Sequence, residues 1–98
     1  MNDRKRTRIP TEFVAGEVEG RGKVRNVSEG GLFVGTRAIP PQGETVRLSL
    51  SVPGHQPIEV TGMVWWTTQE RSGHPDPGFG LRILDDHDDY RAMVDGLA

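Results

Sequence analysis

The stretch Asn26-Val27-Ser28-Glu29-Gly30-Gly31 lies between two apolar runs, at residues 23–27 and 32–34. We interpret it as a strand, a tight turn and a second strand, because paired glycines accept positive φ and let a ligand approach the backbone. Side chains two residues apart in a strand point to the same side, so Asn26 and Ser28 should lie together there. Taken alone, such a stretch is more often an ordinary hairpin with a glycine-rich turn than a binding site.

A second stretch, Arg4-Lys5-Arg6-Thr7-Arg8, carries two arginines four residues apart. About twenty residues later the chain has Asn26, Ser28 and Gly31. This succession, Arg-x-x-x-Arg followed by Asn-x-Ser-x-x-Gly, resembles the PilZ domain family over essentially the whole chain. Members of that family bind the bacterial second messenger cyclic di-GMP. Many members have Asp where this chain has Asn26, and Asn is a recognised variant at that position.

The resemblance implies a ligand site built from both motifs. Arg4 and Arg8 would bind the nucleotide from one side, since the arginine fork suits phosphate oxygens and the guanine edge. Asn26, Ser28 and Gly31 would form the opposite wall, with the Asn26 carbonyl oxygen accepting a hydrogen bond from a guanine N–H. Three neighbouring residues are auxiliary candidates for contact with the ligand: Lys5, Arg6 and Gly30.

The composition fits one small domain over residues 1–98. The chain has 13 glycines, 7 prolines and no cysteine, so a disulfide or a thiolate site is excluded. No apolar run approaches about 18 residues, and no apolar segment follows the basic N-terminus, so we expect a soluble, cytoplasmic protein without membrane insertion. The net charge of −2 argues against a general nucleic-acid binder.

Alternating apolar residues predict an all-β fold. The clearest predicted strand is Thr45–Val52, in which every second residue is apolar. Six such segments with short connections, within about 75 residues, predict a closed or nearly closed antiparallel barrel. The PilZ resemblance implies the same architecture, a six-stranded antiparallel β-barrel with a C-terminal helix. We expect a flexible basic arm at residues 1–8, the barrel at residues 11–84 and the helix at residues 85–98.

The predicted helix begins with acidic residues, which suit a helix N-terminus. Asp85 or Asp86 would cap it. Apolar residues at helical spacing form a stripe that would pack on the barrel. This stripe consists of Tyr90, Met93, Val94 and Leu97.

Residues that would support catalysis or metal binding are scattered. His55, His74 and His87 have no metal-ligand spacing, and the acidic residues 85–89 are better explained as a helix start than as a cation site. We therefore expect no enzymatic activity, no catalytic residue, no metal and no cofactor. Trp65 and Trp66 are adjacent in a predicted strand, so at most one could stack on a base, and we expect structural roles for both.

The sequence thus predicts a cyclic di-GMP receptor that passes its signal to a protein effector. The main alternative is a PilZ-fold interaction module that does not bind the nucleotide, and the intact motifs argue against it. A weak nucleic-acid binder that uses the basic arm is disfavoured by the net charge of −2 and the few aromatic residues.

Overall fold

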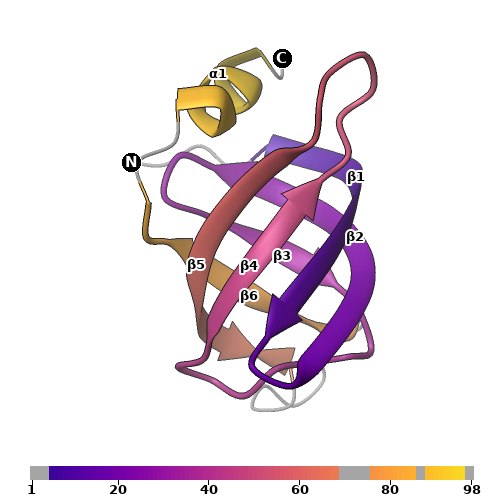
Figure 1. Ribbon diagram of the computed structural model, residues 1–98, viewed down its shortest axis with the longest axis vertical. Coiled ribbons are helices and arrows are strands. Elements are labelled where there is room, and N and C mark those ends of the chain that lie inside the picture. Colours follow the sequence, from indigo (N-terminus) through magenta and orange to yellow (C-terminus); the bar gives the residue numbers. More distant parts are fainter. Residues whose placement is uncertain (1–4, 69–75, 86–87, 97–98) are drawn as a thin grey trace.

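The computed structural model describes residues 5–68, 76–85 and 88–96. In these ranges six strands close into a barrel in the order β1-β2-β3-β6-β5-β4, with every neighbouring pair antiparallel, and one helix follows (Figure 1). The elements are β1 Lys5–Ala15, β2 Val18–Ser28, β3 Gly31–Gly35, β4 Thr45–Leu50, β5 Ile58–Thr67, β6 Gly78–Ile83 and α1 Asp88–Gly96. The predicted six-stranded antiparallel barrel with a C-terminal helix is confirmed.

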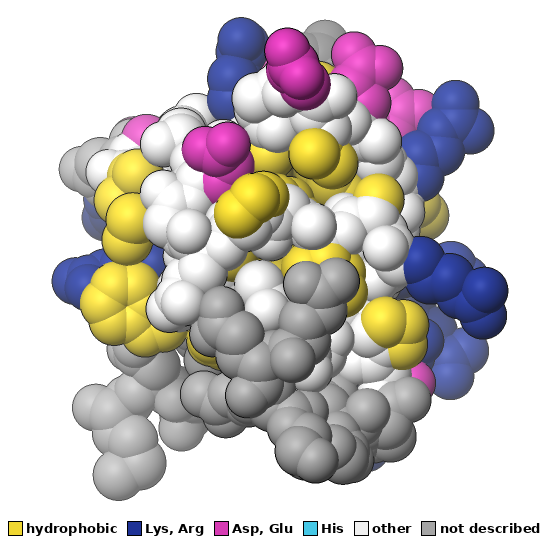
Figure 2. Space-filling model, turned by 90° about the horizontal axis from the view of Figure 1, so that it is seen from below, with side chains coloured by type: hydrophobic (Ala, Val, Ile, Leu, Met, Phe, Trp, Pro, Cys, Tyr) yellow, Lys and Arg dark blue, Asp and Glu magenta, His cyan; other side chains and the backbone are white. Residues whose placement is uncertain are grey.

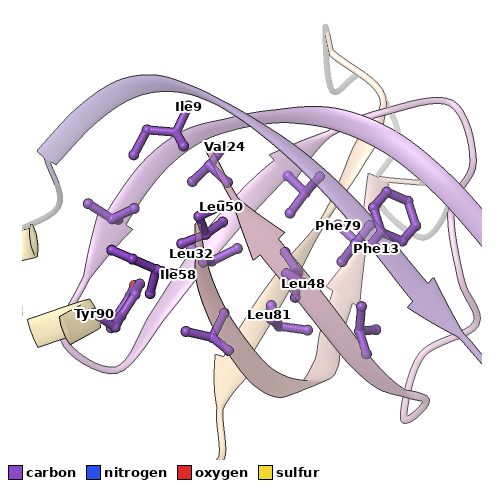
Figure 3. Close-up of a cluster of buried hydrophobic side chains, with 14 of the residues drawn as sticks. Ile9, Phe13, Val24, Leu32, Leu48, Leu50, Ile58, Phe79, Leu81 and Tyr90 are labelled. Atoms are coloured by element: carbon purple, nitrogen blue, oxygen red, sulfur yellow. The ribbon is translucent and has the colours of Figure 1, made fainter. Parts of the chain in front are cut away.

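The alternation of apolar residues fills the barrel. In β4, Val46, Leu48 and Leu50 are buried, while the polar residues between them lie outside. Phe13 of β1 and Phe79 of β6 meet edge to face across the interior, with 5.3 Å between their ring centroids. Side chains from all six strands and from α1 join this cluster (Figure 3). Removing this apolar surface from water is the main force that holds the barrel together.

Seen from the end of the barrel opposite α1, hydrophobic side chains lie around the middle of the molecule, and both Lys or Arg and Asp or Glu side chains project at its edges (Figure 2). The basic side chains therefore project from the outer wall of the barrel.

β1 begins at Lys5, whereas the sequence predicted an arm over residues 1–8 and a barrel from residue 11. Lys5 and Arg6 pair with Val27 and Asn26 of β2, and the Lys5 ammonium group donates a hydrogen bond to the Val94 carbonyl at 2.8 Å. Main-chain pairing of this kind needs no apolar side chain, so the apolar pattern did not reveal it. Residues 1–4 of the predicted arm lie outside the described residues.

α1 begins at Asp88, three residues after the predicted start at Asp85. Asp85 is instead tied to β5, because its Oδ1 accepts a hydrogen bond from the Thr61 N–H at 3.1 Å. The N–H of Leu84 also donates to the Thr61 carbonyl, at 2.9 Å. These bonds hold residues 84–85 against β5, and α1 begins after them. Asp86 lies outside the described residues.

The helix lies over one end of the barrel (Figure 1). Tyr90 and Val94 of the predicted stripe are buried and Met93 packs partly buried against the core, while Leu97 lies outside the described residues. Within the described part of the chain, no helix has the length and apolar character that crossing a membrane would require.

Tyr90 ties the helix to the barrel through its hydroxyl group. That group lies 2.7 Å from the Ser28 carbonyl oxygen and 3.0 Å from the Gly31 carbonyl oxygen, within donating distance of both. All three residues are buried, so this hydroxyl replaces water for two backbone acceptors. The end of β2 and the start of β3 are thereby fixed to α1.

We predict that Tyr90→Phe lowers the free energy of unfolding by about 1–3 kcal/mol, because it removes the hydroxyl from two buried acceptors and keeps the ring. Urea unfolding of both proteins measures the difference. Tyr90→Ala, which also leaves a cavity, should cost about 3–5 kcal/mol. Equal stability of wild type and Tyr90→Phe would show that the hydroxyl contributes nothing net.

Candidate ligand-binding site

The motif segment of β2 contains a bulge that decides which side chains face outward. Val24 and Val27 are both fully buried at 0% exposure, although they are three residues apart. The β2–β3 register shifts between Val24 and Asn26, so one extra residue is accommodated there. Arg25 and Asn26 both lie between the two buried valines and both face outward. A strand without the bulge would have turned one of the two inward.

β1 carries a matching irregularity opposite the bulge. Arg6 pairs with Asn26, and Ile9 pairs with Val24, so Thr7 and Arg8 of β1 face Arg25 of β2. Arg8 is exposed. The second arginine of the first motif therefore lies on the strand next to the second motif. Arg4, the first arginine, lies outside the described residues.

Asn26 belongs to a row of residues that crosses the outer wall of the barrel. It pairs with Arg6 on one side and with Phe33 of β3 on the other, and Phe33 pairs with Gly80 of β6. Directly opposite residues in antiparallel strands point to the same face. Asn26 is half-buried in this row. Asn26 therefore lies between an arginine of β1 and a phenylalanine of β3 in the sheet.

Ser28 lies on the same face as Asn26, since the register between them is regular. Its side chain is only 4% exposed, and its Oγ donates to the Gly31 carbonyl at 3.3 Å. Both ends of this short connection are also bound by the Tyr90 hydroxyl. The Ser28 hydroxyl proton is therefore used to hold the β2–β3 connection.

The position of Gly31 excludes a side chain, but not because of the positive φ that the sequence predicted. Neither Gly30 nor Gly31 has positive φ, which among the described residues occurs at Gly16, Gly43 and Gly54. A Cβ at Gly31 would instead collide with the Leu81 carbonyl oxygen of β6. Gly30 uses its carbonyl to accept from the Ile83 N–H at 3.0 Å.

A stacked pair of aromatic side chains lies beside Asn26 on the outer wall. Phe33 stacks on Trp66, with 5.3 Å between ring centroids and 23° between ring planes. The Trp66 ring lies over Gly80, where a Cβ would collide with Nε1. This aromatic pair therefore adjoins the motif residues, with Phe33 only 5% exposed and Trp66 half-buried. The sequence did not single out Phe33, because its place beside Asn26 depends on the pairing of β2 with β3.

The expectation that Trp65 and Trp66 face opposite sides is wrong. A register shift between Val64 and Trp66 inserts a second bulge, in β5, and the inward positions are Val64 and Thr67. Both tryptophans therefore lie on the outer wall. Trp65 is 52% exposed, and the guanidinium carbon of Arg82 lies 5.0 Å from its ring centroid.

The PilZ domain profile matches residues 1–97. This chain belongs to the PilZ domain family. Among solved structures, it is similar to the Bacillus subtilis inhibitor of motility MotI/DgrA, with a TM-score of 0.75 and 19% sequence identity. The alignment covers 96% of this chain and 46% of that one, so this chain spans about half the length of its neighbour. At this identity, the similarity shows a shared fold. No curated protein matches the chain.

PilZ domains are receptor and adaptor modules, and neither comparison indicates an enzyme family. In the described ranges, no group of three or more His, Cys, Asp or Glu side chains is arranged to hold a metal ion. The outer wall offers a half-buried amide, exposed guanidinium groups and the half-buried ring of Trp66. Such groups suit a planar anion.

Gly31→Ala should destabilise the protein by about 1–3 kcal/mol, since the added methyl group must displace the backbone of β6. Thermal unfolding should show a lower melting temperature. Gly96→Ala is the matched control, because a Cβ there meets nothing within 4 Å and φ is not positive. It should leave stability unchanged or slightly higher. Equal effects of the two variants would contradict the close approach of β3 and β6.

Proposed function

We propose that this protein is a receptor for cyclic di-GMP and binds it on the outer wall of the barrel, beside the bulge of β2. One observation carries the proposal. Arg8 of the first motif and Asn26 of the second belong to neighbouring strands, and the bulge turns Asn26 outward on the wall where Arg8 is exposed. Membership of the PilZ family supports the choice of ligand.

Each proposed contact follows from the chemistry of the ligand, which has two phosphates and two guanines. Arg8 supplies a fork of N–H donors for a phosphate or for the O6 and N7 atoms of guanine. Asn26 supplies a carbonyl oxygen for a guanine N–H. Gly31, whose missing side chain lets β3 approach β6, and Ser28, whose oxygen keeps lone pairs that accept hydrogen bonds, complete the proposed site. Arg4 is proposed as the second arginine from its motif position, with Lys5, Arg6 and Gly30 as auxiliary contacts.

The wider role proposed is that of a bacterial, cytoplasmic signalling module without catalysis. We propose that residues 1–98 act as one PilZ domain and that the bound state is recognised by a protein effector. Trp65 and Leu84, which are 52% and 56% exposed, are apolar groups that such an effector could cover. The same exposed groups favour the second candidate function, a PilZ-fold interaction module that does not bind the nucleotide.

The decisive test is isothermal titration calorimetry with cyclic di-GMP, using GMP, GTP and single-stranded RNA as control ligands. The wild-type protein should bind cyclic di-GMP and none of the controls with comparable affinity. An interaction module would give no heat with any of the four. Binding of RNA in preference to cyclic di-GMP would favour the nucleic-acid alternative.

Arg8→Ala and Asn26→Ala should each weaken binding of cyclic di-GMP, Arg8→Ala by about 1.5–3 kcal/mol, the range for hydrogen bonds to charged groups. Melting temperatures should change by only a few degrees, because Arg8 is exposed and Asn26 is half-buried. Arg47→Ala, an exposed arginine on β4, is the matched control and should bind as the wild type does. Unchanged affinity in both motif variants would refute the assignment of the site.

A further inference from the structure

Four cationic side chains project around the paired irregularities of β1 and β2. Arg6 pairs with Asn26, Arg8 faces Arg25 within the bulge, and Lys23 pairs with Pro10. The cations are Arg6, Arg8, Lys23 and Arg25, and all four are exposed. From Lys23 to Asn26 the strand advances only about 10 Å, so these charges are crowded.

Among residues 5–68, 76–85 and 88–96, no ion pair joins these cations to a carboxylate. The ion pair seen among the described residues joins Arg21 and Glu12, farther along the two strands, at 3.4 Å. Within the residues that the structure describes, none of the four cations forms an ion pair with an acidic side chain. The described part of the chain thus contributes no ion pair that offsets their mutual repulsion, although the whole chain has a net charge of −2. An anion bound between β1 and β2 would relieve it.

Arg25 differs from a freely solvated arginine because it lies across the neighbouring strand. Its Nε and Cγ atoms are 3.0 Å and 3.3 Å from the position that a Cβ of Gly35 would occupy. The bare backbone of Gly35 therefore gives the side chain a surface on β3. A side chain held against the sheet in this way loses less conformational freedom on binding a ligand than one that moves freely.

We propose that Arg25, assisted by Lys23, binds a phosphate group of the nucleotide from the β2 side, opposite Arg8. This inference rests on the proposed function and adds two residues that belong to neither motif. The bulge makes it possible, since it turns Arg25 to the same face as Asn26. The guanidinium fork matches two phosphate oxygens, whereas Lys23 offers a single compact charge.

The test compares four proteins by calorimetry with cyclic di-GMP at two salt concentrations: wild type, Arg25→Gln, Arg25→Lys and Arg47→Gln. Arg25→Gln should weaken binding about ten-fold or more and reduce its dependence on salt. Arg25→Lys should restore part of the loss, because it keeps the charge without the fork. Arg47→Gln removes the same charge about 20 Å away along the barrel wall and should change affinity less than about two-fold.

Adding Lys23→Gln to Arg25→Gln should weaken binding further. This inference would be overturned if the affinity of Arg25→Gln for cyclic di-GMP stayed within about two-fold of the wild-type affinity while Asn26→Ala lost affinity. The proposed function would then still stand. Equal losses in Arg25→Gln and Arg47→Gln would overturn it too, since the effect would then be one of overall charge. Failure of the wild type to bind cyclic di-GMP would overturn the proposed function and this inference together.

Discussion

The spacing of three residues between two buried valines is the constraint on which the candidate site depends. Val24 and Val27 both contribute to the barrel core, and they can do so only if β2 bulges between them. The packing of the core thereby determines which side chains of β2 lie on the outer wall of the barrel. Arg25 and Asn26 face outward together, and β1 accommodates the bulge with its own irregularity beside Arg8. A requirement of packing inside the barrel thus arranges cations and an amide on its outer wall.

A second constraint fixes the other end of the site. β3 is short, and it approaches β6 so closely at Gly31 that no side chain fits between them. The carbonyl oxygens of Ser28 and Gly31 both lie within reach of the Tyr90 hydroxyl of α1. The connection between β2 and β3 is therefore held by the sheet on one side and by the helix on the other. Residues that a ligand would contact here are positioned before it arrives.

The sequence predicted the features that depend on simple periodicity. The alternation in β4 and the helical stripe at Tyr90 and Val94 both match the structure, and so does the closed barrel. The bulge of β2 escaped prediction and that of β5 was not located, because each breaks the two-residue period that defines a strand. For that reason the directions of Arg25 and Trp66 could not be read from the sequence. The adjacency of Phe33 to Asn26 depends on register between strands and was not foreseen either.

Other differences arise from hydrogen bonds between segments that are distant in the sequence. Asp85 looks like a helix cap, but its carboxylate is engaged by the backbone of Thr61. Lys5 looks like part of a solvated tail, but its ammonium group reaches the end of α1. Such long-range bonds depend on the finished fold, so local patterns contain no signal for them.

The most direct measurement of the central claim is a nuclear magnetic resonance titration of the isotopically labelled protein with cyclic di-GMP. The account predicts that amide signals shift most at Arg8, Arg25, Asn26 and Gly31, on the wall formed by β1, β2 and β3. Signals of Arg47 and Glu59, which lie on β4 and β5, should change little. Shifts centred on β4 and β5, or no shifts at saturating nucleotide, would contradict the account.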